Sequence, residues 1–569
     1  MTLDVENQYT NAERAARALY KNGVREIFGQ SNPQTIMLAC EELGIRQIGF
    51  RQENAGAYMA QGYGMVSGKI PVVGAQNGPA AALLVPGLAE AHKSSHAIVA
   101  IVDDVPLRDE DRNAFQELDH FELFKGVAKW VKRVSHPDRI EALIDRAFIE
   151  ASSGRPGPVV LLFPKDIMYS TKKSKANPTS KTSFSHYPLD RPCANLDELQ
   201  KAADFISKAK RPLIYAGGGV NTSGAQNILR KIQDEFNLPI ATTTMGKGAV
   251  DENHPLTLGP IGYYMGNRSR TKYLREYVKQ ADVILLIGNR TNQNGTDSWT
   301  LLPNEATYIH LDISPSEIGR NYPSLRLAGD AKMSLEKLYE LLGEQGASQE
   351  PRDEVRKVIQ HSRQQYSQEV ASYLEKKNEV LHIEHILVEL NKQLEEDHIV
   401  VADASYSSIW ISNFIDASDK RRFIFPRGIA GLGWGLPMAM GAKVAEPGRK
   451  VFCLCGDGGF AHVWSELETC MREGIDVVIG VINNGILGYQ KHAELSKWGK
   501  HTSAIDIKKI DYVKIAEACE MRGMVIDHIS DVESSLKEAF QHKGSVLLDL
   551  RVDASSIPPL TFMQSFDSI

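Results

Sequence analysis

The sequence is poor in cysteine and shows no pattern of disulfides or metal-binding thiols. Its 569 residues include six cysteines, and no two of them form a C-x-x-C pair. Cys453 and Cys455 lie within one apolar run, which predicts a strand in the core and not a pair of metal ligands. Sparse, scattered thiols suit a reducing compartment, so we expect a cytoplasmic protein.

Long apolar runs and an excess of one charge are also absent from the sequence. No run reaches the roughly 18 to 20 apolar residues of a membrane-spanning helix, and the polar first residues lack the basic and apolar regions of a secretory signal. The net charge is −6, and aromatic residues do not alternate with basic clusters. We therefore expect neither a membrane nor a nucleic-acid partner.

What the sequence does contain is an alternation of helical patterns with short β-rich runs, in three segments. Length predicts two to four domains, and the alternation is typical of parallel sheets covered by helices. We predict an α/β protein of three doubly wound parallel-sheet domains at residues 1–170, 196–345 and 381–569, joined by a polar linker at 171–195 and a charged helical linker at 346–380. The predicted strands lie within residues 26–30, 47–50, 70–76, 97–104, 159–164, 212–219, 238–244, 281–290, 306–313, 398–403, 449–457, 476–484 and 544–553.

The clearest chemical signal follows two of these strands in the third segment. Asp457 ends one strand, in the run Gly456 to Gly459, and Asn484 ends the next. Carboxyl ends of parallel strands meet at one edge of the sheet, carboxylate and amide oxygens suit Mg²⁺, and glycines let backbone amides approach a diphosphate. Ordinary turns would explain either motif alone, but the pair favours a metal–diphosphate site.

These motifs resemble those of thiamine diphosphate-dependent enzymes. GDGGF followed by VINN resembles the family's cofactor motif, and RQENAGAYMAQGYG resembles its R-x-E-x-x-A-x-x-x-A-x-G-Y pattern. Further segments are similar to the acetolactate synthase-like branch (acetohydroxyacid synthase large subunit-like), so the resemblance covers nearly the whole chain. It implies a pyrimidine-binding, a middle and a diphosphate-binding domain, in that order. These further segments are Arg112 to His120, Ser153 to Asp166, Thr244 to Gly259, His310 to Gly319 and Gly431 to Ala442.

The resemblance implies a thiamine diphosphate cofactor, Mg²⁺ and a set of residues that would hold them. The side chains of Asp457 and Asn484 and the backbone carbonyl of Ile486 would coordinate Mg²⁺. Leu432 would lie under the cofactor and bend it into a V; a core leucine is the other interpretation of this residue. The remaining cofactor-binding residues implied by the motifs are Asn77, Ser405, Tyr406, Ser407, Gly431, Gly456, Gly458 and Gly459.

Glu53 opens a helical pattern rich in alanine. From these residues alone, the simplest interpretation is an acid that favours the helix dipole. The resemblance implies instead that Glu53 shares a proton with N1′ of the cofactor, in a dry pocket that raises its pKa. Sites in this family lie between two subunits, so the resemblance predicts a homodimer or homotetramer in which Glu53 and Asp457 of one site come from different chains.

The segments that would face the substrate depart from true acetolactate synthases. The loop at 30–32 and the stretch 489–492 differ, and Ala493 replaces a tryptophan that helps to choose the acceptor. We predict a substrate that is bulkier or more polar than 2-oxobutyrate, with loop drift as the alternative. His492 would be a proton donor near pH 7 or else a solvent-facing histidine. The predicted catalytic residues are Glu53, Gln30, Gln116, Tyr489 and His492.

The function that the resemblance implies is carboligation. A 2-oxo acid such as pyruvate would be decarboxylated, and its acyl-anion unit transferred to an aldehyde or a second 2-oxo acid. Simple decarboxylation or C–C cleavage by a lyase or hydrolase is the alternative, and a catalytically silent homologue is a third that the retained Glu53, Asp457 and Asn484 argue against. In the second segment, residues 217–219 and 288–290 resemble an FAD-binding frame, but neighbouring motifs differ. FAD, ADP and no nucleotide remain open.

Overall fold

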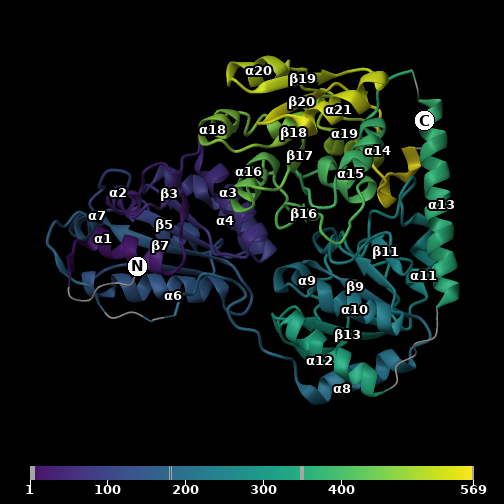
Figure 1. Ribbon diagram of the computed structural model, residues 1–569, viewed down its shortest axis with the longest axis horizontal. Coiled ribbons are helices and arrows are strands. Elements are labelled where there is room, and N and C mark those ends of the chain that lie inside the picture. Colours follow the sequence, from purple (N-terminus) through teal and green to yellow (C-terminus); the bar gives the residue numbers. More distant parts are fainter. Residues whose placement is uncertain (1–6, 178–179, 181, 346–351, 378, 567–569) are drawn as a thin grey trace.

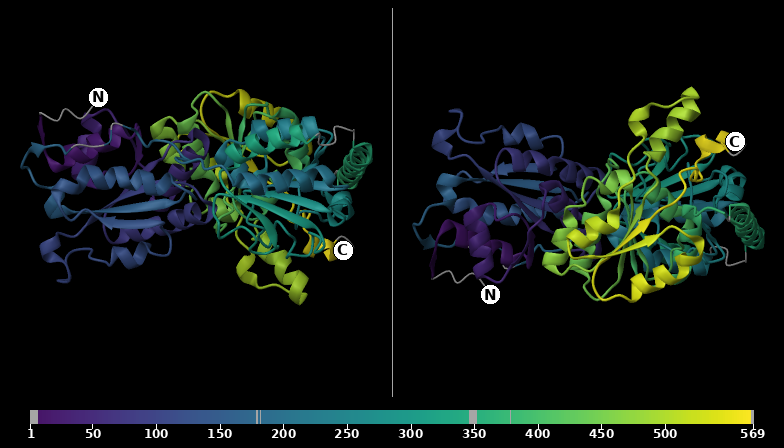
Figure 2. Two further views of the ribbon diagram at one scale, coloured as in Figure 1. Left: turned by 90° about the horizontal axis from the view of Figure 1, so that it is seen from below. Right: turned by 90° about the horizontal axis from the view of Figure 1, so that it is seen from above.

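The computed structural model describes residues 7–177, 180, 182–345, 352–377 and 379–566. It contains three six-stranded parallel sheets covered by helices, and a small antiparallel pair, β1 (Gln8–Tyr9) with β8 (Ser174–Lys175). The N-terminal domain lies at one end of the long axis and the other two domains at the opposite end (Figures 1 and 2). The predicted fold class is confirmed. Of the predicted linkers, residues 178, 179, 181, 346–351 and 378 lie outside the described residues.

The N-terminal sheet has the strand order β3-β2-β4-β5-β7-β6. Chain order reverses between β2 and β4, and ligands of doubly wound sheets bind in the crevice at such a reversal. Its first long helix, α1, begins with a capping box of Thr10 and Glu13. The elements are β2 (Glu26–Phe28), β3 (Arg46–Ile48), β4 (Val72–Ala75), β5 (Ile98–Asp104), β6 (Trp130–Arg133), β7 (Pro158–Pro164), α1 (Asn11–Lys21), α2 (Gln34–Glu42), α3 (Glu53–Ser67), α4 (Pro79–Ser94), α5 (His120–Phe124), α6 (Ile140–Ser152) and α7 (Lys165–Met168).

The middle sheet has the order β11-β10-β9-β12-β13-β14, with its reversal between β9 and β12. Strands β9 and β12 are buried along their whole length, as strands covered by helices on both faces are. The elements are β9 (Pro212–Ala216), β10 (Ile240–Thr242), β11 (Thr257–Pro260), β12 (Val283–Ile287), β13 (Thr307–Asp312), β14 (Ser324–Ala328), α8 (Leu196–Lys208), α9 (Gly218–Ser223), α10 (Gln226–Phe236), α11 (Arg275–Lys279) and α12 (Ala331–Glu344).

The C-terminal sheet has the order β16-β15-β17-β18-β20-β19, with its reversal between β15 and β17. Counted within each domain, this order is the same as that of the N-terminal sheet. The elements are β15 (Ile399–Ala402), β16 (Arg422–Ile424), β17 (Val451–Gly456), β18 (Val478–Ile482), β19 (Arg522–Ile526), β20 (Val546–Leu550), α14 (Ile383–Gln393), α15 (Tyr406–Phe414), α16 (Gly435–Ala445), α17 (Asp457–Phe460), α18 (Glu466–Glu473), α19 (Gly488–Trp498), α20 (Tyr512–Ala518) and α21 (Val532–Gln541).

The predicted helical linker forms one long helix in its described part, α13 (Asp353–Lys376). This helix runs along the outside of the middle and C-terminal domains (Figure 1). It is rich in charged residues, as a solvated helix is. Among the described residues, no helix is long and apolar enough to cross a membrane.

Every apolar run predicted to be a strand forms one, and the strands of the large sheets that the prediction missed all lie at an edge. These are β6, β11, β14, β16 and β19. An edge strand is less covered than a central one: β16 and β19 each begin with an exposed arginine, and β14 exposes Arg326. Strand β11 is buried but contains Gly259 and Pro260, which weaken a strand pattern.

The N-terminal and C-terminal domains pack together through α3 and α16. A Cβ atom on Gly62 would lie 2.2 Å from the carbonyl oxygen of Met438, and one on Gly441 would lie 1.9 Å from the carbonyl oxygen of Met59. Only glycine allows helices to cross at this distance. A single apolar core continues across this contact, with the rings of Tyr58 and Trp434 5.1 Å apart.

Candidate active site

Two strand ends of the C-terminal sheet bring the predicted metal ligands into contact. The Oδ2 atom of Asp457, which follows β17, accepts hydrogen bonds from the amides of Asn484 at 3.1 Å and of Gly485 at 2.7 Å. The Oδ1 atom of Asn484 accepts one from the amide of Ile486 at 3.3 Å. Parallel pairing of β17 with β18 is what brings two residues 27 positions apart to the same place.

The donor set at this point suits a hard cation. Asp457 is 3% exposed; burial raises the pKa of its carboxyl, while amide hydrogen bonds, led by that of Gly485, act in the opposite direction. A carboxylate, a side-chain amide and the carbonyl of Ile486 are all oxygen donors of the kind that Mg²⁺ prefers. The residues present therefore fit the predicted metal.

A second buried carboxylate, Asp403, lies at the next strand end, and the sequence reasoning did not single it out as a site residue. Its Oδ1 atom accepts hydrogen bonds from the amides of Trp434 and Gly435, and its Oδ2 atom accepts one from Gly433 at 3.1 Å. A Cβ atom on Gly459 would lie 2.0 Å from Oδ2, so this position needs glycine. Asp403 thus joins the Asp457 turn to the segment that carries Leu432. An aspartate directly after a buried strand was the available signal.

The predicted diphosphate-contacting loop lies beside the glycine turn. Ser405 has a φ of +64°, which L residues rarely adopt, and it precedes α15. Ser407 is buried, and its Oγ atom lies 3.9 Å from the position of a Cβ atom on Gly456. The start of α15 and the Gly456 turn therefore meet at the reversal between β15 and β17. Amides at a helix start favour an anion such as a diphosphate.

Leu432 lies in the segment that leads into α16. Its side chain is 38% exposed, so the interpretation as a core leucine is wrong. Gly431 precedes it, and a Cβ atom there would lie 2.6 Å from the ring of Trp434. Trp434 itself is buried, which leaves Leu432 as the apolar side chain that this turn presents outward.

The predicted substrate-facing residues gather around Tyr406. Its hydroxyl lies 2.6 Å from Nδ1 of His492, and their rings stack with centroids 5.7 Å apart. The ring of Tyr489 lies 5.9 Å from that of Tyr406 and is 39% exposed. His492 is buried, which contradicts the solvent-facing interpretation. Burial lowers the pKa of His492 to about 4, and the positive charge of Lys491 acts in the same direction.

Glu53 and Gln30 lie at the carboxyl edge of the N-terminal sheet. Glu53 is the half-buried first residue of α3, and the helix behind it is buried almost without interruption from Ala55 to Val66. Gln30 follows β2 and is exposed, and its side-chain amide donates to the carbonyl oxygen of Phe50, after β3. The two strand ends are thereby linked beside Glu53.

Comparisons with known proteins agree with this geometry. The N-terminal TPP binding domain of thiamine pyrophosphate enzymes matches residues 10–123, the central domain 199–338 and the C-terminal TPP binding domain 403–550. This chain belongs to the thiamine pyrophosphate enzyme family.

Relatives within this family cover nearly the whole chain. It is 31% identical to the probable acetolactate synthase large subunit of Methanococcus aeolicus, over 96% of the chain and 93% of that protein. It is 30% identical to the acetolactate synthase isozyme 3 large subunit of Escherichia coli strain K12, over 96% and 95%. The predicted family and branch are confirmed.

The N-terminal part of this thiamine pyrophosphate enzyme places the predicted residues Asn77 and Gln116 beside two polar residues that the sequence reasoning missed, Lys165 and Asp103. The side-chain amide of Asn77 donates to the carbonyl of Gln116 at 3.0 Å, and Lys165 donates to the Asn77 Oδ1 atom at 2.8 Å. Nearby Asp103 is 1% exposed, and neither of its oxygens has a hydrogen-bond partner among the described residues. Burial raises the pKa of Asp103 to about 7, while the positive charge of Lys165 acts in the opposite direction. Lys165 directly follows a parallel strand, and Asp103 lies at the end of another. These positions were the available signal.

The middle domain of the enzyme opens onto a cavity of about 840 Å³. The residues that resembled a nucleotide frame all line it, at the carboxyl ends of its strands. A Cβ atom on Gly217 would lie 2.2 Å from the carbonyl oxygen of Gly288, so the backbones after β9 and β12 touch at the reversal. Burial raises the pKa of Asp312, at the end of β13, to about 6. The arginines that line the cavity are Arg155, Arg191, Arg230, Arg290, Arg421, Arg422, Arg427 and Arg449.

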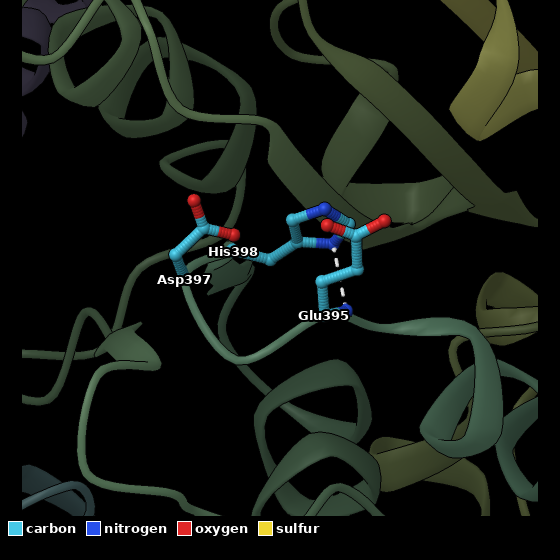
Figure 3. A group of neighbouring side chains, drawn as sticks. All are labelled: Glu395, Asp397 and His398. Carbon is cyan, nitrogen blue, oxygen red and sulfur yellow. Dashed lines mark hydrogen bonds between the residues drawn. The ribbon is translucent and has the colours of Figure 1, made fainter.

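A group of acidic and histidine side chains lies before β15, and one of its members, Asp397, also lines this cavity. Glu395, Asp397 and His398 place one ligand atom each within 4.8 Å of one another (Figure 3). The two acids are exposed, and the Nδ1 atom of His398 accepts a hydrogen bond from the amide of Glu395 at 3.3 Å. The His398 ring also stacks on Phe540. Turn geometry and packing account for this group, and we assign no metal to it.

Proposed function

We propose that this chain is a thiamine diphosphate- and Mg²⁺-dependent carboligase, which decarboxylates a 2-oxo acid such as pyruvate and transfers the acyl unit to an aldehyde or a second 2-oxo acid. The observation that carries the proposal is the contact of Asp457 with the Asn484–Ile486 turn, at the carboxyl edge of a parallel sheet. Similarity to acetolactate synthases along nearly the whole chain supports the same activity.

Some residues of the chain would bind the metal and the diphosphate, and Glu53 would hold a proton. Asp457, Asn484 and Ile486 would hold Mg²⁺, and the turns at Gly456 and Ser405 would line the diphosphate. When bound, the cofactor supplies the carbanion chemistry. Glu53 would hold a proton at the pyrimidine N1′ atom, from the first position of a helix that is buried from Ala55 onward.

We propose that the enzyme works as a homodimer or homotetramer with each site shared by two chains. Large apolar side chains at or beside predicted site residues are exposed in one chain: Leu432 is 38% exposed, Ile429 in the same segment 53%, and Phe115, next to Gln116, 79%. A second copy that covers them would complete the site, with Glu53 from one chain and Asp457 from the other.

All six cysteines are free thiols, which supports a cytoplasmic location.

The substrate pocket favours an acceptor that is bulkier or more polar than 2-oxobutyrate. Ala493 stands where acetolactate synthases have a tryptophan, which leaves space, and the phenol of Tyr489 brings a polar group. The imidazole of His492 would act as a neutral hydrogen-bonding group beside Tyr406. Gln30 and Gln116 would orient the substrate from the N-terminal domain.

The cavity that the middle domain shares with the N-terminal and C-terminal domains suits a nucleotide such as FAD or ADP. Its arginines offer partners for phosphates, and buried Asp312 offers an acceptor for a sugar hydroxyl. A visible absorbance spectrum of the purified protein tests for FAD. Mass spectrometry of the ligand released on denaturation tests for ADP.

The activity itself is tested on purified protein with thiamine diphosphate and Mg²⁺. Pyruvate is supplied with and without a panel of aldehydes and 2-oxo acids, and products are identified by mass spectrometry. We expect a ligated product with at least one acceptor. Release of CO₂ without any ligated product would overturn the carboligase proposal in favour of simple decarboxylation.

A further inference from the structure

The segment from Arg427 to Gly435, which carries Leu432, is held at both ends. At its start, the Nη2 atom of Arg427 donates to the hydroxyls of Tyr263 at 3.0 Å and Tyr264 at 2.8 Å, both in the middle domain. At its end, the amides of residues 433–435 donate to Asp403 of the C-terminal domain. The intervening turn would be free to move unless something held its centre.

Glu90, near the end of α4 in the N-terminal domain, holds that centre. Its carboxylate accepts hydrogen bonds from the amides of Gly428 and Ile429, each at 2.6 Å, and of Ala430 at 3.4 Å. The residue is 0% exposed. Burial raises the pKa of the Glu90 carboxyl, and the amides of Ile429, Gly428 and Ala430 act in the opposite direction. Because one buried carboxyl group accepts from three successive amides, it fixes the turn of one domain to a helix of another.

The backbone of the turn is shaped around this carboxylate. A Cβ atom on Gly428 would lie 2.5 Å from Oε2 of Glu90, so only glycine fits there. Ala430 has a φ of +60°, a conformation that costs an L residue free energy and persists only when its surroundings impose it. Two independent features of the segment therefore match the position of Glu90.

We propose that Glu90 is a positioning residue, whose carboxylate fixes residues 428–430 so that Leu432 is presented to the cofactor in one conformation. This rests on the proposed function and on the role that the family resemblance implies for Leu432, under the cofactor. Nothing in the family motifs of Glu53 or Asp457 points to Glu90, which contributes through the backbone and touches no reacting atom. Each active site then draws on two N-terminal domains: Glu53 from one chain, and Glu90 from the chain that supplies Asp457.

The first test measures the contact itself, without cofactor or substrate. Amide hydrogen exchange is followed by mass spectrometry in the full-length protein and in Glu90→Gln, which keeps the size of the side chain but removes its charge. We expect faster exchange at 428–430 in the variant. Glu41→Gln, at an exposed glutamate of α2 in the same domain, is the matched control and should exchange there like the wild type. Unchanged exchange at 428–430 in Glu90→Gln would overturn the proposal.

The second test asks whether the contact positions the cofactor. The rate of C2–H exchange of bound thiamine diphosphate is measured by NMR, together with the cofactor Kd. Because a small displacement of reacting groups can cost up to about 100-fold in rate, we expect C2–H exchange and kcat to fall about 10- to 100-fold in Glu90→Gln while KM changes little. Faster amide exchange with a wild-type C2–H rate would mean that Glu90 only joins two domains, and would refute positioning.

A variant on the loop side keeps the test independent of the folding of Glu90 variants. Gly428→Ala places a methyl group against both the carboxylate and the backbone carbonyl oxygen of Glu90, each 2.5 Å from the position of its Cβ atom, so the turn must move away from Glu90. We expect faster amide exchange at 428–430 and slower C2–H exchange, as in Glu90→Gln. A wild-type C2–H rate in a Gly428→Ala protein whose amides exchange faster would contradict the proposal.

Leu432→Ala separates the failure of this proposal from that of the proposed function. If wild-type protein does not accelerate C2–H exchange, the proposed function fails and the amide-exchange result still decides whether the contact exists. If wild type accelerates exchange and Leu432→Ala retains the full rate, the positioning of Leu432 is unimportant and the proposal for Glu90 is refuted.

Discussion

The N-terminal and C-terminal sheets have the same strand order, but the acidic side chains at the carboxyl ends of their strands differ in their hydrogen bonds. In the C-terminal sheet, Asp403 and Asp457 each accept hydrogen bonds from three backbone amides. In the N-terminal sheet, Asp103 is equally buried and accepts none from the described residues. Glu53 lies at this same edge, half-buried at a helix start.

The difference matches the two parts of the cofactor that the domains would bind: the diphosphate with its metal, and the pyrimidine. A metal–diphosphate group needs fixed anionic and amide groups, which the C-terminal edge provides through rigid turns. A pyrimidine needs a carboxyl that can hold a proton, which is the role proposed for Glu53; at the same edge, burial without amide donors favours the protonated form of Asp103. The same strand order can thus serve a metal–diphosphate site or a pyrimidine site, because the residues at the strand ends determine which one forms.

Glu53→Gln is expected to give the largest effect at the N-terminal edge. The amide cannot share a proton with the pyrimidine, so C2–H exchange should fall about 10²- to 10⁴-fold, the usual range for a lost proton-transfer group. Cofactor binding should persist, because the C-terminal domain supplies the metal and diphosphate contacts. NMR exchange rates and a binding titration measure both, and a wild-type exchange rate would refute the role assigned to Glu53.

Asp457→Asn tests the C-terminal edge, and its signature should be the opposite. The loss of one anionic ligand should weaken Mg²⁺ binding by at least about 10- to 100-fold, the range for even an outer-shell partner. Cofactor affinity should fall with it, and excess Mg²⁺ should restore part of the activity. Titration of Mg²⁺ against activity measures this, and an unchanged midpoint would contradict metal binding at Asp457.

The sequence could predict central strands and strand-end motifs because burial on both faces demands continuous apolar runs. It missed β14, β16 and β19, since an edge strand can carry exposed arginines. It placed Asp457 beside Asn484 because parallel pairing obliges strand ends to meet. It offered a signal for Asp403, which directly follows a buried strand, but none for Glu90, because the partners of Glu90 are backbone amides of a distant segment and every residue type has the same amide.

Gly459→Ala should show how tightly the C-terminal edge is packed. The added methyl group would meet the Asp403 carboxylate at 2.0 Å, and overpacking of this kind costs about 1 to 3 kcal/mol of unfolding free energy. Gly448→Ala, whose Cβ atom would meet nothing within 4 Å, is the matched control in the same domain. Urea unfolding of both variants measures the difference, and equal midpoints would show that the turn can relax around Asp403.

Asp103→Asn should give the smallest effect and one that depends on pH. The folded-state pKa of Asp103 is about 7, above its unfolded value near 4, so between these values the folded protein binds the extra proton. Stability therefore falls as pH rises from about 4 to 7, and by pH 8 the buried charge costs about 2 kcal/mol after allowance for relaxation.

The variant removes that cost, because a neutral amide has no charge to bury. Its unfolding free energy should exceed that of the wild type at pH 8 by more than it does at pH 5, by about 1.3 kcal/mol, because roughly a third of the cost is already present at pH 5. Urea unfolding at the two pH values measures this difference of differences, which is insensitive to any uniform effect of the substitution. An equal gap at both pH values would mean that Asp103 is ionised at pH 5 in the folded protein and that Lys165 offsets its burial. In that case both domains would hold charged carboxylates at their strand ends, and the contrast between them would rest on Glu53 alone.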